Sequence, residues 1–535
     1  MNKKSICFFL VAVLMLCLSG CQKSAAGKTN TPSAKASDQS HGNTVTLLFN
    51  KSDSLDPYTA KSENNRLITK LIFEPLVKTD DNLEPVNRLA EEVRLEGKTC
   101  TVTLKSARFS DGSAVTSSDV VYSYNIAKNY GGLYTSHLYE VSSISALSAD
   151  TVAFSLTAND PYFANLLDFP VLKAGSEKAT DSDGNLKTPI GCGRYAATSD
   201  PYLLSQNEHF FGENGAIKEI KLINAPDDDS ISHYIEIGAA DLYYSDLSSD
   251  NLVRMSGSRT DINLNTLIYI GINTASAELK DKRMRYAISS ALDRTAICQD
   301  AFFNSATPAS GYFNPVLTKT SAVQSLKPRS DSEITIDNLK KIGYNDKNAD
   351  GYFVDANGKH HIFKLLVNKE SRSKAAAANL IAAQLRSAGI QVTVTECSYG
   401  EFLSRLSTNS FELYLGEISI LPNFDMSPLV VSGGSAAYGL GKVKTEAEEN
   451  KDGEKDAENE APGAADTENA PIKKIYDEYK SGAASISDVA GTLLTEMPQI
   501  PLLYKHGLLF SNDHISNIEA SECDVFFSIE KYKIK

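Results

Sequence analysis

The sequence of 535 residues contains no tryptophan and lacks two common short motifs of hydrolases. It has no Gly-x-Ser-x-Gly nucleophile turn and no His-Glu-x-x-His zinc helix. A surface hydrolase or carboxypeptidase would need a nucleophile–base pair or a metal cluster, and the sequence shows neither. We therefore expect no enzyme activity, no catalytic residue, no metal and no cofactor.

Few cysteines lie in the part of the chain that could form disulfides or metal sites. Of the eight cysteines, three lie among the first 21 residues. The other five are widely scattered and odd in number, which predicts neither a disulfide framework nor a metal site. We expect them to be small buried apolar residues. They are Cys100, Cys192, Cys298, Cys397 and Cys523.

Basic residues are fewer than acidic ones. The chain has 53 Lys and Arg against 67 Asp and Glu, which gives a net charge of −14. Residues 445–471 alone contribute −8, from 10 acidic residues and 2 lysines, which leaves −6 for the rest of the chain. Nothing in this balance indicates a nucleic-acid partner. Because residues 445–471 also lack large apolar side chains, we predict that they form a disordered acidic insertion.

No apolar run is long enough to span a membrane. The run at residues 6–18 has 13 residues, whereas a spanning helix needs about 20. It follows two lysines and ends in small residues before Cys21, which is the order of an export signal. We predict a signal peptide at residues 1–20. An ordinary secretory signal with a chance cysteine is the alternative.

A cysteine placed after small residues at the cut resembles the bacterial lipoprotein box. The resemblance implies cleavage before Cys21, a diacylglyceryl thioether on its sulfur, and a mature protein tethered outside the membrane. Residues 22–43 contain no large apolar residue. We predict that they form a flexible linker.

Periodic patterns predict the first elements of the globular part. A strand is expected at residues 44–49, and a hairpin at residues 93–104 with its turn at 96–98. Thr116, with Asp119 three residues later, is a candidate N-cap for the helix that follows.

Strands and helices alternate in the second half of the chain. The predicted elements are one long helix at 281–303, strand 361–367, helix 372–388, strand 391–397, helix 401–406, strand 411–415, and late strands at 500–504 and 524–529. Strand–helix–strand at this spacing predicts a parallel sheet with right-handed crossovers.

Several motifs in a fixed order resemble those of the family-5 extracellular solute-binding proteins, the receptors of oligopeptide, dipeptide and nickel ABC importers. The resemblance runs from about residue 44 to the C-terminus, apart from the acidic insertion. The motifs are residues 54–57 and 71–76, residues 89–91 leading to 109–112 and 118–121, the glycine-rich turn 191–195, and residues 283–287 with 291–294.

The resemblance implies an α/β fold of two lobes like that of periplasmic binding proteins, of type II with an extra subdomain in lobe I. The implied boundaries are lobe I at residues 44–270, with the subdomain at about 58–190, lobe II at 271–500, and a return to lobe I at 501–535. The lobes are expected to close over a ligand held between them.

The family's peptide receptors bind the free amine of the ligand with an aspartate that follows a tryptophan. Here the corresponding loop spans residues 417–428, and the aligned position falls near Pro422. A buried ammonium needs a paired carboxylate. Either Asp425 or Glu417 therefore substitutes, or the ligand has no free amine.

The resemblance implies further ligand contacts in two other loops. One is a Ser-Gly-Gly-Ser loop at residues 432–435, where glycines let backbone amides approach a ligand. An ordinary turn is the alternative there. The other is the lobe-I loop that meets the ligand backbone. The candidate ligand-binding residues are Asp425, Ser432, Gly433, Gly434, Ser435, Tyr438, Ser62 and Glu63.

The expected function is that of a monomeric, lipid-anchored receptor on the extracytoplasmic face of the cell membrane. It would capture a small ligand, in the first place a peptide, and deliver it to the permease subunits of an ABC importer. One alternative is a receptor of the same fold for a metal chelate, opine, sugar or signalling molecule. Another is a surface lipoprotein with no role in transport.

Overall fold

A computed structural model describes residues 42–130, 132–247, 256–440 and 470–535. The predicted signal peptide, Cys21, all but the end of the predicted linker, and nearly all of the acidic insertion lie outside the described residues. The described residues form one compact unit. No helix among the described residues is long and apolar enough to cross a membrane.

Two small sheets dominate the first part of the chain. The first consists, in spatial order, of β1 (Thr44–Phe49), β10 (Glu219–Asn224), β9 (Leu203–Gln206) and β8 (Tyr195–Ala197). The second consists of β4 (Ala90–Glu96), β5 (Thr99–Leu104), β7 (Thr151–Leu156) and β6 (Val141–Ala146). The predicted strand at 44–49 and the predicted hairpin at 93–104 are both confirmed.

The largest sheet has seven strands. They are, in spatial order, β11 (Leu242–Ser245), β19 (Gln499–Ser511), β12 (Ser258–Ile272), β18 (Leu413–Ser419), β16 (Ile362–Asn368) and β17 (Gln391–Cys397), with β13 (Ala306–Pro308) paired to β19. As predicted, β16 is parallel to both β17 and β18. Short two-stranded pairs complete the strands: β2 (Val77–Thr79) with β3 (Pro85–Asn87), β14 (Asp346–Lys347) with β15 (Phe353–Val354), and β20 (Ile515–Ser516) with β21 (Lys533–Ile534).

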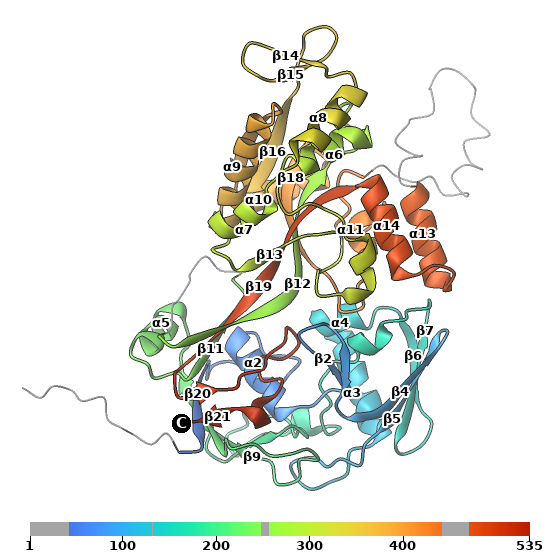
Figure 1. Ribbon diagram of the computed structural model, residues 1–535. Coiled ribbons are helices and arrows are strands. Elements are labelled where there is room, and N and C mark those ends of the chain that lie inside the picture. The colour runs from blue at the N-terminus through green and yellow to red at the C-terminus, as the bar shows by residue number, and fades with distance from the viewer. Residues whose placement is uncertain (1–41, 131, 248–255, 441–469) are drawn as a thin grey trace, which may run out of the picture. The chain divides into compact units, whose positions relative to one another are not determined.

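Helices cover these sheets (Figure 1). They are α2 (Glu63–Ile72), α3 (Ser117–Asn129), α4 (Leu133–His137), α5 (Asp228–Glu236), α6 (Lys282–Ser290), α7 (Arg294–Asp300), α8 (Ser332–Lys341), α9 (Arg372–Ser387), α10 (Tyr399–Ser407), α11 (Ser427–Val430), α13 (Ala470–Ser481) and α14 (Ile486–Glu496). Thr116 precedes α3 as predicted, and its backbone N–H donates to the Asp119 carboxylate at 3.0 Å.

The two longest strands, β12 and β19, lie side by side along most of their length (Figure 1). Their antiparallel pairing is interrupted between Asn263 and Leu267, where three residues of β12 face Lys505 alone. Backbone groups freed by this bulge must bond elsewhere, because a buried unpaired polar group costs free energy. The carbonyl of Leu264 accepts the side-chain amide of Asn314 at 3.0 Å.

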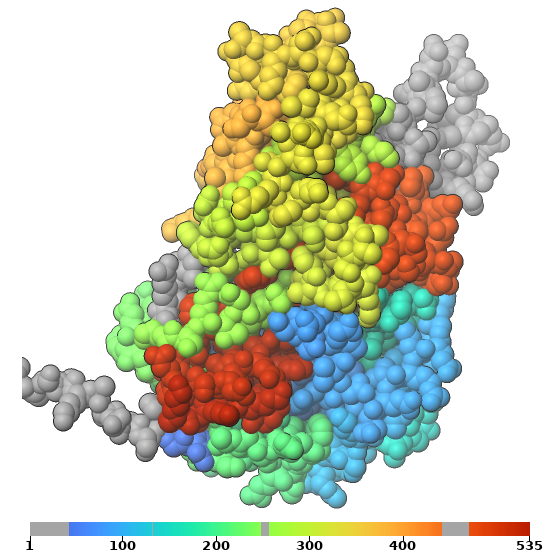
Figure 2. All heavy atoms as spheres, viewed as in Figure 1, coloured from blue at the N-terminus to red at the C-terminus, as the bar shows by residue number. Residues whose placement is uncertain are grey.

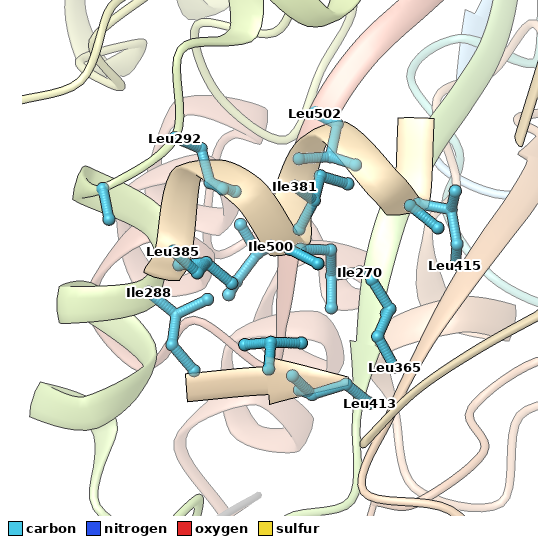
Figure 3. Packing of buried hydrophobic residues seen from close by; sticks show 14 of the residues in the cluster. Ile270, Ile288, Leu292, Leu365, Ile381, Leu385, Leu413, Leu415, Ile500 and Leu502 are labelled. Carbon is cyan, nitrogen blue, oxygen red and sulfur yellow. The ribbon is translucent and has the colours of Figure 1, made fainter. Parts of the chain in front are cut away.

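The main core packs helices against the large sheet (Figure 3). Its strands contribute Ile270, Leu365, Leu413, Leu415, Ile500 and Leu502, and its helical region contributes Ile288, Leu292, Ile381 and Leu385. Each of these side chains is almost fully buried. Burying one such side chain stabilises the fold by about 1.5–3 kcal/mol.

The predicted single helix at 281–303 is wrong, because the chain forms α6 and α7 with a break between them. Asp293 causes the break: its carboxylate accepts the N–H of Ala296 at 2.9 Å and so starts a new helix. Its own N–H donates to the side chain of Gln384 at 2.9 Å. A short polar side chain can thus end one helix and cap the next without a proline or glycine.

The predicted strand at 524–529 is also wrong. The segment forms turns, since the Asp524 carboxylate accepts the N–H of Phe526 at 2.9 Å. The same carboxylate pairs with Lys78 at 2.7 Å. An apolar run that looked extended is therefore folded around a buried charge.

Candidate functional site

A cavity of about 460 Å³ opens where six separate segments of the chain meet. Its volume falls in the range of roughly 300–1,000 Å³ that small-molecule sites occupy. The segments lie at residues 57–79, 132–137, 168–170, 419–422 and 522–525, and the sixth contributes Tyr244 of β11. Much of the wall is apolar or aromatic, including Tyr58, Phe73, Tyr134, Tyr244, Ile420 and Val525.

One wall of the cavity is a face of helix α2. Ser62 caps this helix, accepting the N–H of Asn65 at 3.3 Å. The face toward the cavity carries Glu63, Arg66 and Lys70, which recur at helical spacing. The opposite face is buried in the core. Burial, with Asp246 nearby, raises the pKa of Glu63 to about 7.

A second wall comes from the short helix α4. Its His137 is only 2% exposed and its Nδ1 lies 2.8 Å from the Asp168 carboxylate. Burial alone would lower the pKa of His137, but Asp168 outweighs it and raises that pKa. The other ring nitrogen, Nε2, is buried with no hydrogen-bond partner in the described part of the chain.

A third wall is the C-terminal segment at 522–525, which carries Glu522. One oxygen of Glu522 accepts the backbone N–H of Asn265 at 3.0 Å, and Asn265 lies within the bulge of β12. Burial raises the pKa of Glu522 to about 7, although the Asn265 N–H acts to lower it. The Asn265 side chain donates to the carbonyl of Ile420 at 3.0 Å, so one residue ties two walls together.

A buried chain of alternating charges holds the C-terminal segment in place. Asp524 pairs with Lys78 at 2.7 Å, Lys78 with Glu74 at 3.2 Å, and Glu74 with Arg88 at 3.0 Å. Burial alone would raise the pKa of Glu74, but the two cations lower it to about 2. In Figure 2 the red C-terminal residues accordingly lie beside blue residues from the first part of the chain.

The two carboxylates proposed from the sequence as amine ligands are both paired with lysines of the chain itself. Asp425 lies 3.2 Å from Lys480 and accepts the hydroxyl of Tyr139 at 3.1 Å. Glu417 lies 2.7 Å from Lys374 and 2.8 Å from Lys505. Burial would raise the pKa of each carboxyl, but the lysines hold both below their usual values. Neither residue lines the cavity.

The Lys480 ammonium also lies 2.8 Å from Glu140, so it pairs with two carboxylates at once. A second polar contact runs beside it, from the amide of Asn423 to Asp160 at 2.8 Å. These contacts join residues 139–160 to residues 423–425 and α13. The arrangement is a polar bridge between parts of the chain far apart in sequence.

The other predicted site residues divide between the cavity and its surroundings. Glu63 lines the cavity, whereas Ser62 caps α2 without being part of the wall. The loop at 432–435 follows α11 as a tight turn, in which a side chain on Gly434 would collide with the carbonyl of Pro428. Tyr438 packs edge-on against Tyr414. None of the residues from Ser432 to Tyr438 lines the cavity, and their role in binding stays a prediction.

Several cavity residues were not identified from the sequence. The spacing of Glu63, Arg66 and Lys70 along α2 could have been noticed, because they share one helical face. No local pattern marks His137 or Glu522, whose importance depends on which distant segments they meet. No group of three or more His, Cys, Asp or Glu within the described residues could hold a metal ion.

The chain belongs to the bacterial extracellular solute-binding proteins of family 5, whose model for the middle region matches residues 84–438. This match covers well over half of the 535 residues. The family is one of extracellular solute-binding proteins and not of enzymes.

One curated relative is the oligopeptide-binding protein AppA of Bacillus subtilis. It is 24% identical over 445 residues, which cover 77% of this chain and 80% of the relative.

Solved structures share the fold. The periplasmic murein tripeptide binding protein MppA, in an unliganded open form, has a TM-score of 0.71 at 15% identity, covering 92% of this chain and 97% of that one. A nickel ABC transporter protein from Bacillus halodurans has a TM-score of 0.70 at 18% identity, covering 92% and 100%. The predicted α/β fold of two lobes, like that of periplasmic binding proteins, is confirmed. The chain is a substrate-binding protein of the ABC-importer type.

Replacing Lys480 tests whether the ion pairs of the polar bridge stabilise the fold. Replacing Lys480 by Met leaves Asp425 and Glu140 buried without their cation, so we expect a loss of about 3 kcal/mol in the free energy of unfolding at pH 7. The pKa of Asp425 is lowered in the folded state, so the pair stabilises the fold at neutral pH and its contribution is lost in acid. The difference between variant and wild type should therefore shrink below about pH 4.

Urea unfolding of both proteins at pH 7 and in acid measures this difference. Lys473→Met is the matched control, because Lys473 lies on the same helix in an exposed pair with Asp477. It should cost no more than about 0.5 kcal/mol. Equal stability of the two variants at pH 7 would contradict the role given to Lys480.

Proposed function

We propose that the protein is a lipid-anchored receptor that captures a peptide in the cavity beside α2 and delivers it to an ABC permease. The observation that carries this proposal is the cavity itself. Under the boundaries predicted for the lobes, residues 419–422 belong to lobe II and the other walls to lobe I. A ligand there would touch both lobes, as capture by closure requires.

The chemistry of the wall suits a peptide. Aromatic and aliphatic side chains offer apolar surface for the side chains of a ligand. Arg66 and Lys70 can face a carboxylate, and Glu63 and Glu522 can face an ammonium. The name of the AppA relative, an oligopeptide-binding protein, agrees with this substrate class.

A second candidate is a metal chelate, because the nickel transporter structure shares the fold at a TM-score of 0.70. Since no metal-binding group occurs among the described residues, the metal would have to arrive already chelated. Its negative groups would then lie against Arg66 and Lys70.

The lipid on Cys21 would keep this receptor close to its permease. A tether raises the effective concentration of receptor near its partner without any new contact. The protein acts by binding and release, and we assign it no reaction.

Capture of peptides tests the function. We expect protein purified without denaturation to bind members of a mixed library of tri- to hexapeptides, one peptide per chain, as seen by native mass spectrometry. Leu67→Trp should fill part of the cavity and weaken capture by about tenfold or more.

The matched control for that variant is Leu403→Trp, on the exposed surface of α10 and away from the cavity. It should bind as the wild type does. Binding of a nickel chelate with no capture of any peptide would favour the second candidate instead.

The anchor has its own test. Intact-mass measurement of protein extracted from membranes should show a mature chain that begins at Cys21 and carries the mass of a lipid. Cys21→Ser should abolish the lipid, whereas Cys17→Ser, within the predicted signal, should leave it unchanged. A mature N-terminus elsewhere, with Cys21 unmodified or removed, would refute the anchor.

A further inference from the structure

Three carboxylates line the cavity, and two of them form no ion pair within 4.0 Å among the described residues, although the Lys70 ammonium acts on both from a greater distance. The third is Asp168, whose carboxylate lies 2.8 Å from Nδ1 of His137. No lysine, arginine or histidine nitrogen of the described residues lies within 4.0 Å of the carboxylate of Glu63 or Glu522. A carboxylate held in a partly desolvated site without a cation is a ready partner for a positive group from outside.

Glu522 is the better positioned of the two. The Asn265 N–H fixes one of its oxygens at 3.0 Å, and the buried Asp524–Lys78 pair anchors the same segment. Glu63 lies in the first turn of α2, and no hydrogen bond to its carboxylate is formed within the described residues. A carboxylate that is already held in place loses less entropy when it binds a ligand.

His137 offers a second acceptor near Glu522. At a pH above the raised pKa of His137, the ring is neutral, and when its Nδ1–H donates to Asp168 it presents Nε2 as an acceptor. This nitrogen belongs to a side chain that is 2% exposed and lines the cavity, and it has no partner among the described residues. His137 and Glu522 line the same cavity.

We propose that Glu522 and His137 together bind the primary ammonium of the ligand, and that the loop at 417–428 does not. Two of the three N–H groups of an ammonium would donate to the Glu522 carboxylate and to Nε2 of His137. The carboxylates of that loop already form ion pairs: Asp425 with Lys480, and Glu417 with Lys374 and Lys505. The inference rests on the proposed function and names the ligand class as one with a free amine.

The test compares two libraries of the same tri- to hexapeptides, one with free amines and one N-acetylated. Acetylation removes the charge and leaves the Glu522 carboxylate unpaired, so we expect the wild type to prefer free amines by about tenfold or more. Glu522→Gln should reduce that preference to about twofold. The measurement is competitive capture by native mass spectrometry.

Glu519→Gln is the matched control. Glu519 lies three residues before Glu522 in the chain, pairs with Lys531 at 2.7 Å, and is not part of the cavity wall. It should keep the full preference. If Glu522→Gln does not fold, as judged by thermal melting, His137→Gln replaces it and should reduce the preference at least threefold.

The outcomes separate the two claims. Equal capture of both libraries by the wild type, or loss of preference in Asp425→Asn rather than in Glu522→Gln, would overturn the ammonium site while leaving peptide capture intact. Capture of neither library would contradict the proposed function, and the ammonium site would fall with it.

Discussion

The interruption of pairing between β12 and β19 is the constraint on which the site depends. At this interruption three residues of β12 face Lys505 alone, and the middle one is Asn265. Its N–H holds Glu522, and its carbonyl accepts the N–H of Ile420 at 2.8 Å, which continues the pairing of β12 with β18. One irregular residue thereby fixes the C-terminal segment and the loop after β18 beside the same cavity.

Neutralisation of buried charge explains much of what surrounds that bulge. Lys480 pairs with Asp425, and Lys505 pairs with Glu417. Lys78 pairs with Asp524 and so anchors the C-terminal segment. In each case a carboxylate that would be costly to bury alone is matched by a cation. Glu522 differs from these residues because its carboxylate forms no ion pair within 4.0 Å among the described residues, and the role we propose for it is to bind the ligand.

Local patterns in the sequence predicted the regular elements well. The strand at 391–397 and the hairpin at 93–104 follow from side-chain alternation, and both are present. The break at Asp293 and the turns at Asp524 were missed because a single carboxylate redirects the chain there. Apolar periodicity carries no information about such hydrogen bonds.

The site was harder to predict than the fold. Glu63 was reached through resemblance to the family, and it does line the cavity. Asp425 was chosen because it is a carboxylate in the expected loop, but its partner Lys480 is 55 residues away in sequence. Glu522 and Asn265 are separated by 257 residues, so only the folded chain shows that they meet. Choosing between a structural and a binding carboxylate required knowing which cation each one already has.

A crystal structure of the protein with a captured peptide tests the account most directly. The account predicts electron density for the peptide in the cavity beside α2, with its amino terminus within hydrogen-bond distance of Glu522 and His137. Density at the loop of residues 432–435, or an amino terminus bound by Asp425 with Lys480 displaced, would contradict it.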